Sequence, residues 1–196
     1  MTEGPILFSS SMVLAILGGR KTQTRRVIKP EWYRCLDLSD PVDIDKALAR
    51  CPYGRNRLWV RETHAIEAHI NDNARIVYRA DGYARWFDDV PVGDPFYLPS
   101  DYKAKWRPSI HMPRWASRIN LDIASLRLER LQNISDDDVM AEGASGTAPE
   151  DTFDSPREEF AHLWDSINSK RGYGWESNPF VWAVEWKPII DGTEKK

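Results

Sequence analysis

The sequence predicts an α+β fold built around a small mixed β-barrel. At least five short segments carry strand patterns, and a few helical segments with capping signals lie among them. Strands and helices do not alternate regularly, which argues against a βαβ arrangement. Since no linker separates two groups of apolar segments in the 196 residues, we expect one domain over 1–190, with insertions at 29–56 and 64–110 and a frayed tail at 191–196.

The first 28 residues predict a strand, a helix and a second strand. Residues 5–8 form a short apolar run, and the serines at 9–11 can cap a helix. The helix has apolar residues at helical spacing, namely Met12, Val13, Ile16 and Leu17. Gly18 and Gly19 supply a left-handed stop, after which 21–28 is expected to be extended.

The middle of the chain predicts short elements within long loops. Proline and glycine interrupt 29–56, which leaves one short helix near 44–49. Residues 58–63 alternate like a strand, and 75–79 form another short one. Four prolines among aromatic residues predict a long ordered loop over 81–110, because disordered segments are poor in aromatics.

Regular patterns return after residue 118. Residues 119–123 and 126–131 predict two strands, and Ser135 begins a helix with three aspartates in its first turn that ends near Glu142. A capping box at 155–158 precedes an amphipathic stripe of Phe160, Leu163, Trp164 and Ile167. A final strand is expected over 180–187.

The net charge of −3, from 27 Lys and Arg against 30 Asp and Glu, hides an uneven distribution. Residues 1–34 and 101–130 each carry a balance of +4, whereas 131–165 carry −9. The basic segments can form a face for an anionic ligand, or they can simply be solvated. The overall charge disfavours tight nonspecific binding of long polyanions and fits a small ligand or a short exposed nucleotide better.

The composition predicts a cytoplasmic protein that does not enter the membrane. No run approaches the roughly 20 apolar residues of a membrane span, and the first residues lack the features of a secretory signal. Two cysteines cannot form a disulfide framework. Cys35 and Cys51, with His64 and His69, do not match a zinc spacing, so we expect neither a metal nor a cofactor.

The most specific string is Gly19-Arg20-Lys21-Thr22-Gln23-Thr24-Arg25-Arg26, in which a glycine turn leads directly into a strand. Lys21 lies at the turn, where it can approach Thr24 although strict alternation would place them on opposite faces. An amine beside a hydroxyl can activate a weak nucleophile. An exposed strand whose cations protect a sheet edge explains the same spacing.

Several strings in order resemble ASCH-domain proteins, especially those of phages and prophages. They are ILFSSSMVLAILGGRKTQTRR with its G-x-K-x-x-T-x-R motif, LWVRET, PSIHMPRWASR and LQNISDDDVMAEG. The resemblance covers 5–28, 57–63, 106–142 and 157–187. It implies that the barrel is of the PUA-like type, with peripheral helices and long loop insertions.

The resemblance also implies a chemistry. Small bacterial members of the family are amidohydrolases that act on N4-acetylcytidine through a Lys, a Thr and a Glu. The matching positions make Thr24 the nucleophile, Lys21 its activator and Glu142, seven residues after Ser135, the proton shuttle. Without the family, Glu142 is simply the last residue of an exposed helix. This chain is about twice as long as those enzymes, so its insertions can reshape the pocket and change the substrate.

Six further residues are candidates for ligand binding. In the run 108–118, His111 and Arg114 favour a site that neutralises phosphate, whereas Trp115 suits either stacking or the core. Arg25 and Arg26 can add phosphate contacts from the neighbouring strand. Glu62 can point into the barrel mouth beside Lys21, or form a structural ion pair with Arg61 or Arg25.

The sequence therefore predicts a protein that binds a nucleobase, a nucleoside or an RNA-like ligand, and whose most concrete activity is hydrolysis of an N4-acylated cytidine. A non-catalytic nucleic-acid binding module would use the same pocket and the two basic segments. A phage accessory protein that binds a host protein would use the aromatic insertions instead. The oligomeric state is left open.

Overall fold

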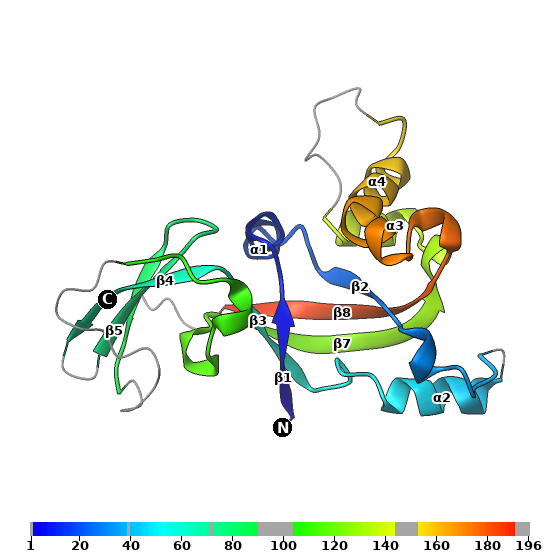
Figure 1. Ribbon diagram of the computed structural model, residues 1–196, viewed down its shortest axis with the longest axis horizontal. Helices are drawn as coiled ribbons and strands as arrows, with labels where there is room; N and C mark the ends of the chain where they lie inside the picture. Colours follow the sequence, from blue (N-terminus) through cyan, green and yellow to red (C-terminus); the bar gives the residue numbers. More distant parts are fainter. Residues whose placement is uncertain (1, 39, 71–72, 90–103, 144–152, 191–196) are drawn as a thin grey trace.

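The computed structural model describes residues 2–38, 40–70, 73–89, 104–143 and 153–190. Within them the protein is a mixed α+β fold with eight strands in two sheets (Figure 1). The larger sheet has the strand order β1-β3-β7-β8-β2. Its members are β1 (Glu3–Leu7), β2 (Gln23–Val27), β3 (Arg57–Arg61), β7 (Ile119–Arg130) and β8 (Phe180–Ile190).

The larger sheet does not close into the predicted barrel. β1 and β2 are its two edges, and β1 pairs only with β3 in the described residues, while β2 pairs only with β8. The reason lies in the length of the central β7–β8 pair. β2 runs against 181–185 at one end of that pair, whereas β3 runs against 120–122 at the other end. The two edges therefore lie too far apart along the sheet to meet.

The core of this sheet confirms the predicted N-terminal elements. Helix α1 (Ser10–Leu17) starts where the Ser9 hydroxyl accepts the Met12 amide N–H, and Gly19 adopts a left-handed φ of +70° after the helix. Val13 and Ile16 pack into one cluster with the inner face of β8, which includes Trp182. Helix α2 (Pro41–Ala49) lies below β7 in Figure 1 and contributes Ala47 to the same cluster.

The second sheet confirms the strand predicted at 75–79 and corrects the long loop predicted over 81–110. Strands β4 (His64–Ile70), β5 (Asn73–Tyr78) and β6 (Ala84–Phe87) form an antiparallel sheet of their own, and β6 lies within the predicted loop. A register shift between Ile66 and Ala68 interrupts the alternation of β4, and β6 has only four residues. Both features weaken a strand signal. Part of the predicted loop, 90–103, lies outside the described residues.

The C-terminal elements follow the predicted signals, with one difference. The Ser135 and Ser155 side chains accept the N3 amide N–H groups of helices α3 (Asp136–Ala141) and α4 (Pro156–Asn168). The two strands predicted over 119–131 are one strand, β7, with a bulge between Ile123 and Ser125. The predicted frayed tail, 191–196, and most of the loop after Gly143 lie outside the described residues.

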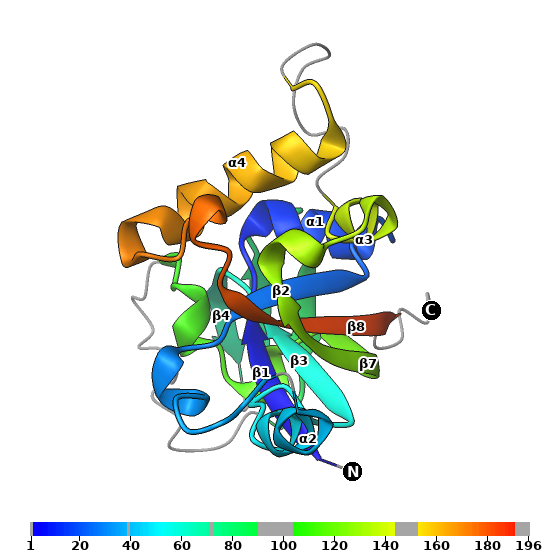
Figure 2. The same cartoon turned by 90° about the vertical axis from the view of Figure 1, so that its right-hand side faces the viewer.

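Figure 2 shows α4 lying across the molecule above α1 and β2, with α3 beside them. Short 3₁₀ turns connect the larger elements, at Pro30–Trp32, Ser109–His111, Arg114–Ala116, Leu131–Asn133, Ser169–Arg171 and Trp175–Ser177. Among the described residues, no helix has both the length and the apolar character needed to span a bilayer. The arrangement leaves a space between α4 and the strand that carries the G-x-K-x-x-T-x-R motif.

Candidate functional site

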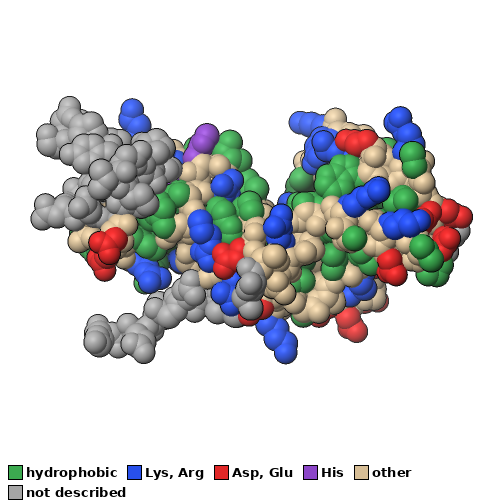
Figure 3. Space-filling model, turned by 90° about the horizontal axis from the view of Figure 1, so that it is seen from below, with side chains coloured by type: hydrophobic (Ala, Val, Ile, Leu, Met, Phe, Trp, Pro, Cys, Tyr) green, Lys and Arg blue, Asp and Glu red, His purple; other side chains and the backbone are tan. Residues whose placement is uncertain are grey.

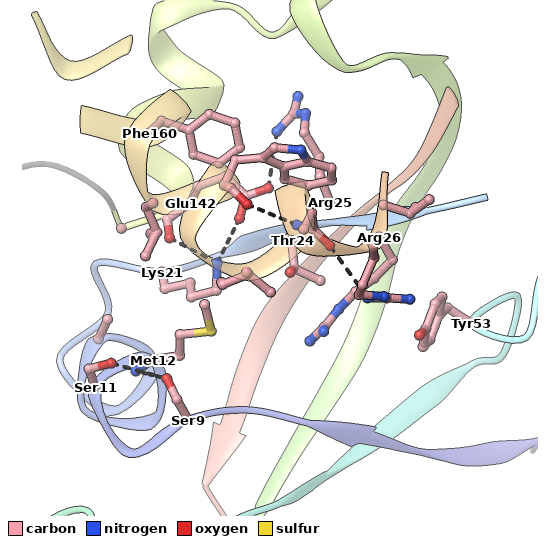
Figure 4. A pocket seen from close by; sticks show the side chains of 18 residues that line it. Ser9, Ser11, Met12, Lys21, Thr24, Arg25, Arg26, Tyr53, Glu142 and Phe160 are labelled. Atoms are coloured by element: carbon pink, nitrogen blue, oxygen red, sulfur yellow. Dashed lines mark hydrogen bonds and ion pairs between the residues drawn. The ribbon is translucent and has the colours of Figure 1, made fainter. Parts of the chain in front are cut away.

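A pocket of about 510 Å³ lies between β2, α1 and α4 (Figure 4). It is lined from α1 and the turn before it by Ser9, Ser11, Met12 and Ala15; from the motif by Lys21, Thr24, Arg25, Arg26 and Val27; from the loop before β3 by Tyr53; from the end of α3 by Glu142 and Gly143; and from α4 and the turn after it by Phe160, Leu163, Trp164, Ile167, Asn168 and Arg171. The volume is within the range of small-molecule sites. Five of the nine predicted site residues meet here.

A buried ion pair forms the floor of the pocket. Lys21 Nζ donates to Glu142 Oε2 at 2.7 Å and to the Glu142 carbonyl oxygen at 2.8 Å, and the two side chains are 2% and 6% exposed. Burial lowers the pKa of the Lys21 ammonium, and the neighbouring Glu142 carboxylate offsets only part of this effect. A larger fraction of Lys21 is therefore unprotonated at a given pH than of an ordinary surface lysine.

The backbone before β2 explains how Lys21 reaches the same cavity as Thr24. The Lys21 amide N–H donates to the Ala15 carbonyl, so Lys21 still belongs to the turn after α1 and does not follow the pleat that begins at Gln23. The Lys21 and Thr24 side chains both face the pocket, as expected if Lys21 lies in the turn and outside the strand. Both residues are almost fully buried.

Gly143 allows the backbone after Glu142 to pass close to Lys21. It has a left-handed φ of +77°, which favours glycine, and a Cβ at this position would lie 3.2 Å from Lys21 Cβ and 3.4 Å from Ala15 Cβ. The chain can therefore turn away after Glu142 while staying against Lys21. The glycine is needed both for the backbone angle and for the space.

Arg25 anchors the carboxylate from the other side. Its Nη1 lies 3.3 Å from Glu142 Oε1, its Nη2 donates to Asp138 at 2.7 Å and its Nε donates to Glu129 at 2.9 Å. Gln23 completes the group, since it accepts from Arg25 and donates to Asp138. The buried Arg25 guanidinium is thus occupied by protein carboxylates and holds Glu142 in position instead of meeting a ligand.

The network also affects Asp138. Burial raises the pKa of its carboxyl, but hydrogen bonds from Gln23 and Arg25 and the charges of Arg25 and Arg127 outweigh that effect, so the pKa is lowered. Asp138 belongs to the acidic segment that the sequence places in the first turn of α3. The acidic and basic segments therefore meet at the base of the pocket.

Helix α4 forms an apolar wall that the sequence did not assign to a site. Phe160 and Trp164 are buried in a cluster with Val181 of β8. Leu163 and Ile167, from the same stripe, are 38% and 48% exposed and line the pocket. The apolar stripe of α4 therefore contains more residues than the core contact needs. These additional apolar residues are the feature of the sequence that could have predicted the apolar wall of the pocket.

Glu62 lies outside the pocket lining. Its carboxylate accepts from Arg118 Nε and Nη2, each at 2.9 Å, and Arg118 also donates to Asp81 at 2.8 Å and lies 4.1 Å from the centre of the Tyr78 ring. The expected position beside Lys21 is wrong, as are the suggested partners Arg61 and Arg25. The buried Arg118 holds both oxygens of Glu62 in a structural ion pair outside the pocket lining.

The predicted residues of the 108–118 run also lie elsewhere. Arg114 pairs with Glu3 at 2.8 Å and donates to Asn120 at 2.9 Å, in a side chain that is 41% exposed. His111 is exposed in a 3₁₀ turn, and Trp115 packs edge-to-face against Phe87 at 5.6 Å. None of the three is part of the pocket lining.

The sequence did not mark several of the lining residues as site residues. Ser9, Ser11 and Tyr53 belong to a helix cap and a loop, and Arg171 follows α4 in a 3₁₀ turn. Polar residues at caps and turns are expected for local reasons alone, so their chemistry is visible only once the chain is folded.

Among the residues that the structure describes, no group of three or more His, Cys, Asp or Glu side chains is arranged to hold a metal ion. No family model, no curated protein and no solved structure matches the chain.

Proposed function

We propose that this protein hydrolyses the exocyclic amide of an N4-acylated cytidine in the pocket between β2 and α4. The observation that carries the proposal is the buried 2.7 Å contact of Lys21 Nζ with Glu142, in the cavity onto which Thr24 opens. A weak hydroxyl nucleophile needs a nearby base, and a desolvated amine held by a carboxylate is such a base.

The residues have distinct roles in this reaction. Thr24 Oγ1 attacks the acyl carbon while its proton passes to the unprotonated amine of Lys21, and the Glu142 carboxylate stabilises the resulting ammonium. The proton then goes to the exocyclic nitrogen as the bond from carbon to nitrogen breaks, which releases cytidine with its free amine and leaves an ester on Thr24. Water adds to this ester as Lys21 takes one of its protons; that proton then passes to Thr24 Oγ1 as the ester bond breaks, and the carboxylic acid leaves.

We extend the proposal to the family and setting of the protein. The order β1, α1, β2 places the G-x-K-x-x-T-x-R segment at the pocket, which supports an ASCH domain of the PUA-like type whose sheet is open between its two edges. Cys35 and Cys51 are both free thiols, which supports a reducing, cytoplasmic setting.

Thr24→Ala tests the activity. We expect turnover of N4-acetylcytidine to fall at least about a thousandfold, because a hydroxyl that forms the covalent intermediate has no substitute. Thr22→Ala is the matched control, since Thr22 uses its backbone to bond Ala141 and Trp186 and is not part of the pocket lining. Equal turnover by the two variants, with unchanged melting temperatures, would contradict a Thr24 nucleophile.

A second candidate function, nucleic-acid binding without catalysis, is favoured by a different surface. Arg61 and Arg114 lie 4.8 Å and 5.8 Å from the ring of the largely buried Trp59, and Arg79 lies 5.8 Å from the ring of Trp106, which is 48% exposed. Figure 3 shows Lys and Arg side chains interspersed with hydrophobic ones over one face. Stacked bases and phosphates suit such a surface. Steep salt dependence of RNA binding that Arg114→Ala reduces and Thr24→Ala leaves unchanged would identify this function.

A further inference from the structure

Arg26 differs from Lys21 and Arg25, the other two cations of the motif that line the pocket. Lys21 and Arg25 are occupied by Glu142 and neighbouring carboxylates, but no carboxylate of the described residues forms an ion pair with Arg26. Its Nη2 donates to the Leu7 carbonyl at 2.7 Å, and its guanidinium lies 5.1 Å from the centre of the Phe8 ring. Within the described part of the chain, its buried Nε has no hydrogen-bond partner.

This arrangement leaves a positive charge available inside the cavity. Burial lowers the pKa of Arg26, yet a guanidinium stays protonated at neutral pH. A buried donor without a partner is unfavourable, and an anion in the pocket would neutralise the guanidinium charge. Tyr53 lies beside the Arg26 side chain in Figure 4 and can add a hydroxyl donor.

A second guanidinium, from the turn after α4, lines the same cavity. Arg171 follows α4 and is exposed. Within the described residues it forms a 3.4 Å hydrogen bond to Asn168 and lies 6.0 Å from the centre of the Tyr173 ring, and neither contact neutralises its charge. Arg26 and Arg171 thus come from two elements that are 145 residues apart and face one pocket. Two arginines around one space are typical of phosphate recognition.

We propose that Arg26, Arg171 and Tyr53 form a phosphate subsite, so that the ligand is a cytidine nucleotide and not a free nucleoside. This inference rests on the proposed function for the identity of the base. The phosphate binds at the Arg26 end, the acylated base reaches Lys21 and Thr24, and the apolar wall of Leu163 and Ile167 covers the sugar and base. A free mononucleotide and the terminal nucleotide of an RNA carry the same phosphate ester.

The test measures binding of cytidine, 5′-CMP, 3′-CMP and the dinucleotide CpA by isothermal titration calorimetry. We expect wild-type protein to bind one monophosphate at least about tenfold more tightly than cytidine, the effect of one charge-assisted contact. Arg26→Gln and Arg171→Gln should each remove most of this preference and leave the affinity for cytidine within about twofold. Preference for CpA over both monophosphates would identify an RNA end as the source of the phosphate.

Arg50→Gln is the matched control, since it removes the same charge from an exposed residue at the end of α2, outside the pocket lining. If Arg26→Gln unfolds the protein because the contact with Leu7 is lost, Arg171→Gln at its exposed position still decides the outcome. Equal binding of cytidine and all phosphate esters by wild-type protein would overturn the subsite, and so would a phosphate preference that survives in Arg171→Gln.

Turnover separates this inference from the proposed activity. N4-acetylcytidine and its 5′-monophosphate are compared as substrates. Phosphate-dependent binding without hydrolysis of either compound would leave the subsite in place and exclude the hydrolase. Hydrolysis of both compounds at equal kcat/KM, unaffected in Arg26→Gln, would leave the hydrolase in place and exclude the subsite.

Discussion

Arg25 Nη1 lies 3.3 Å from Glu142 Oε1, the carboxylate oxygen that Lys21 does not hold. Each oxygen of Glu142 therefore has its own cation, and the two cations come from one short segment of the chain. The carboxylate cannot rotate without breaking one contact. This arrangement fixes the Lys21 amine relative to Thr24, and it makes Arg25 a positioning residue.

Arg25→Gln should destabilise the protein strongly. The guanidinium is buried against Glu129, Asp138 and Glu142, and its removal leaves only Lys21 and the partly exposed Arg127 to balance these three carboxylates. Loss of one partner from such a network costs about 3–5 kcal/mol. Arg57→Gln, which breaks a partly exposed pair with Asp122, should cost at most about 1 kcal/mol. Urea denaturation of both variants measures the difference, and equal losses would contradict the prediction.

Gly143→Ala should impair the pocket beyond its effect on the backbone. Any L side chain at a left-handed φ costs about 1–2 kcal/mol. The added Cβ would also approach Lys21 Cβ to 3.2 Å and displace it from Glu142. Gly82→Ala is the matched control, because its φ is +70° and a Cβ there would meet nothing within 4 Å.

The two glycine variants are compared by thermal unfolding and by turnover of N4-acetylcytidine. We expect similar backbone penalties, a further loss of stability in Gly143→Ala alone, and a loss of activity confined to that variant. An active Gly143→Ala protein would show that the position of Lys21 tolerates displacement, against the geometry described.

In Lys21→Met, the free energy of unfolding should rise less steeply with pH above neutrality than in wild-type protein. Burial holds the pKa of Lys21 in the folded protein below its ordinary value of 10.5. Between the two values the unfolded chain binds more protons than the folded one, so wild-type protein gains stability as the pH rises through this window. Below the window the full cost of the buried ammonium remains. Urea unfolding between pH 7 and 10.5 measures both slopes, and identical slopes would contradict the lowered pKa.

Glu62→Gln should reduce stability without changing the pocket. Glu62 is paired with the buried Arg118, which also holds Asp81 near the second sheet, so loss of its charge should cost about 3–5 kcal/mol. Cytidine affinity should stay within about twofold, because Glu62 is not in the lining. The partly exposed Glu67 provides a control, since Glu67→Gln should cost at most about 1 kcal/mol. Weakened cytidine binding by a folded Glu62→Gln protein would restore Glu62 as a ligand residue.

The sequence predicted elements well wherever local signals define both ends. Ser9, Ser135 and Ser155 each begin a helix as expected, because an N-cap is an interaction between residues two or three apart. The prediction failed for β4 and β6, where a register shift and short length remove the period. It also failed for barrel closure, which depends on where β2 and β3 pair along β7 and β8, and no local pattern carries that register.

The sequence by itself determined the order of strands and helices around the motif, and it placed Lys21 at a turn from which it can reach the side of Thr24. Only the tertiary structure decided which carboxylate each cation holds. Glu142 comes from 121 residues away to bind Lys21, while Glu62 is bound by Arg118 on another part of the sheet. Charge pairing depends on distances of a few ångströms between residues far apart in the chain, and only the packing of α3, α4 and the sheets sets those distances.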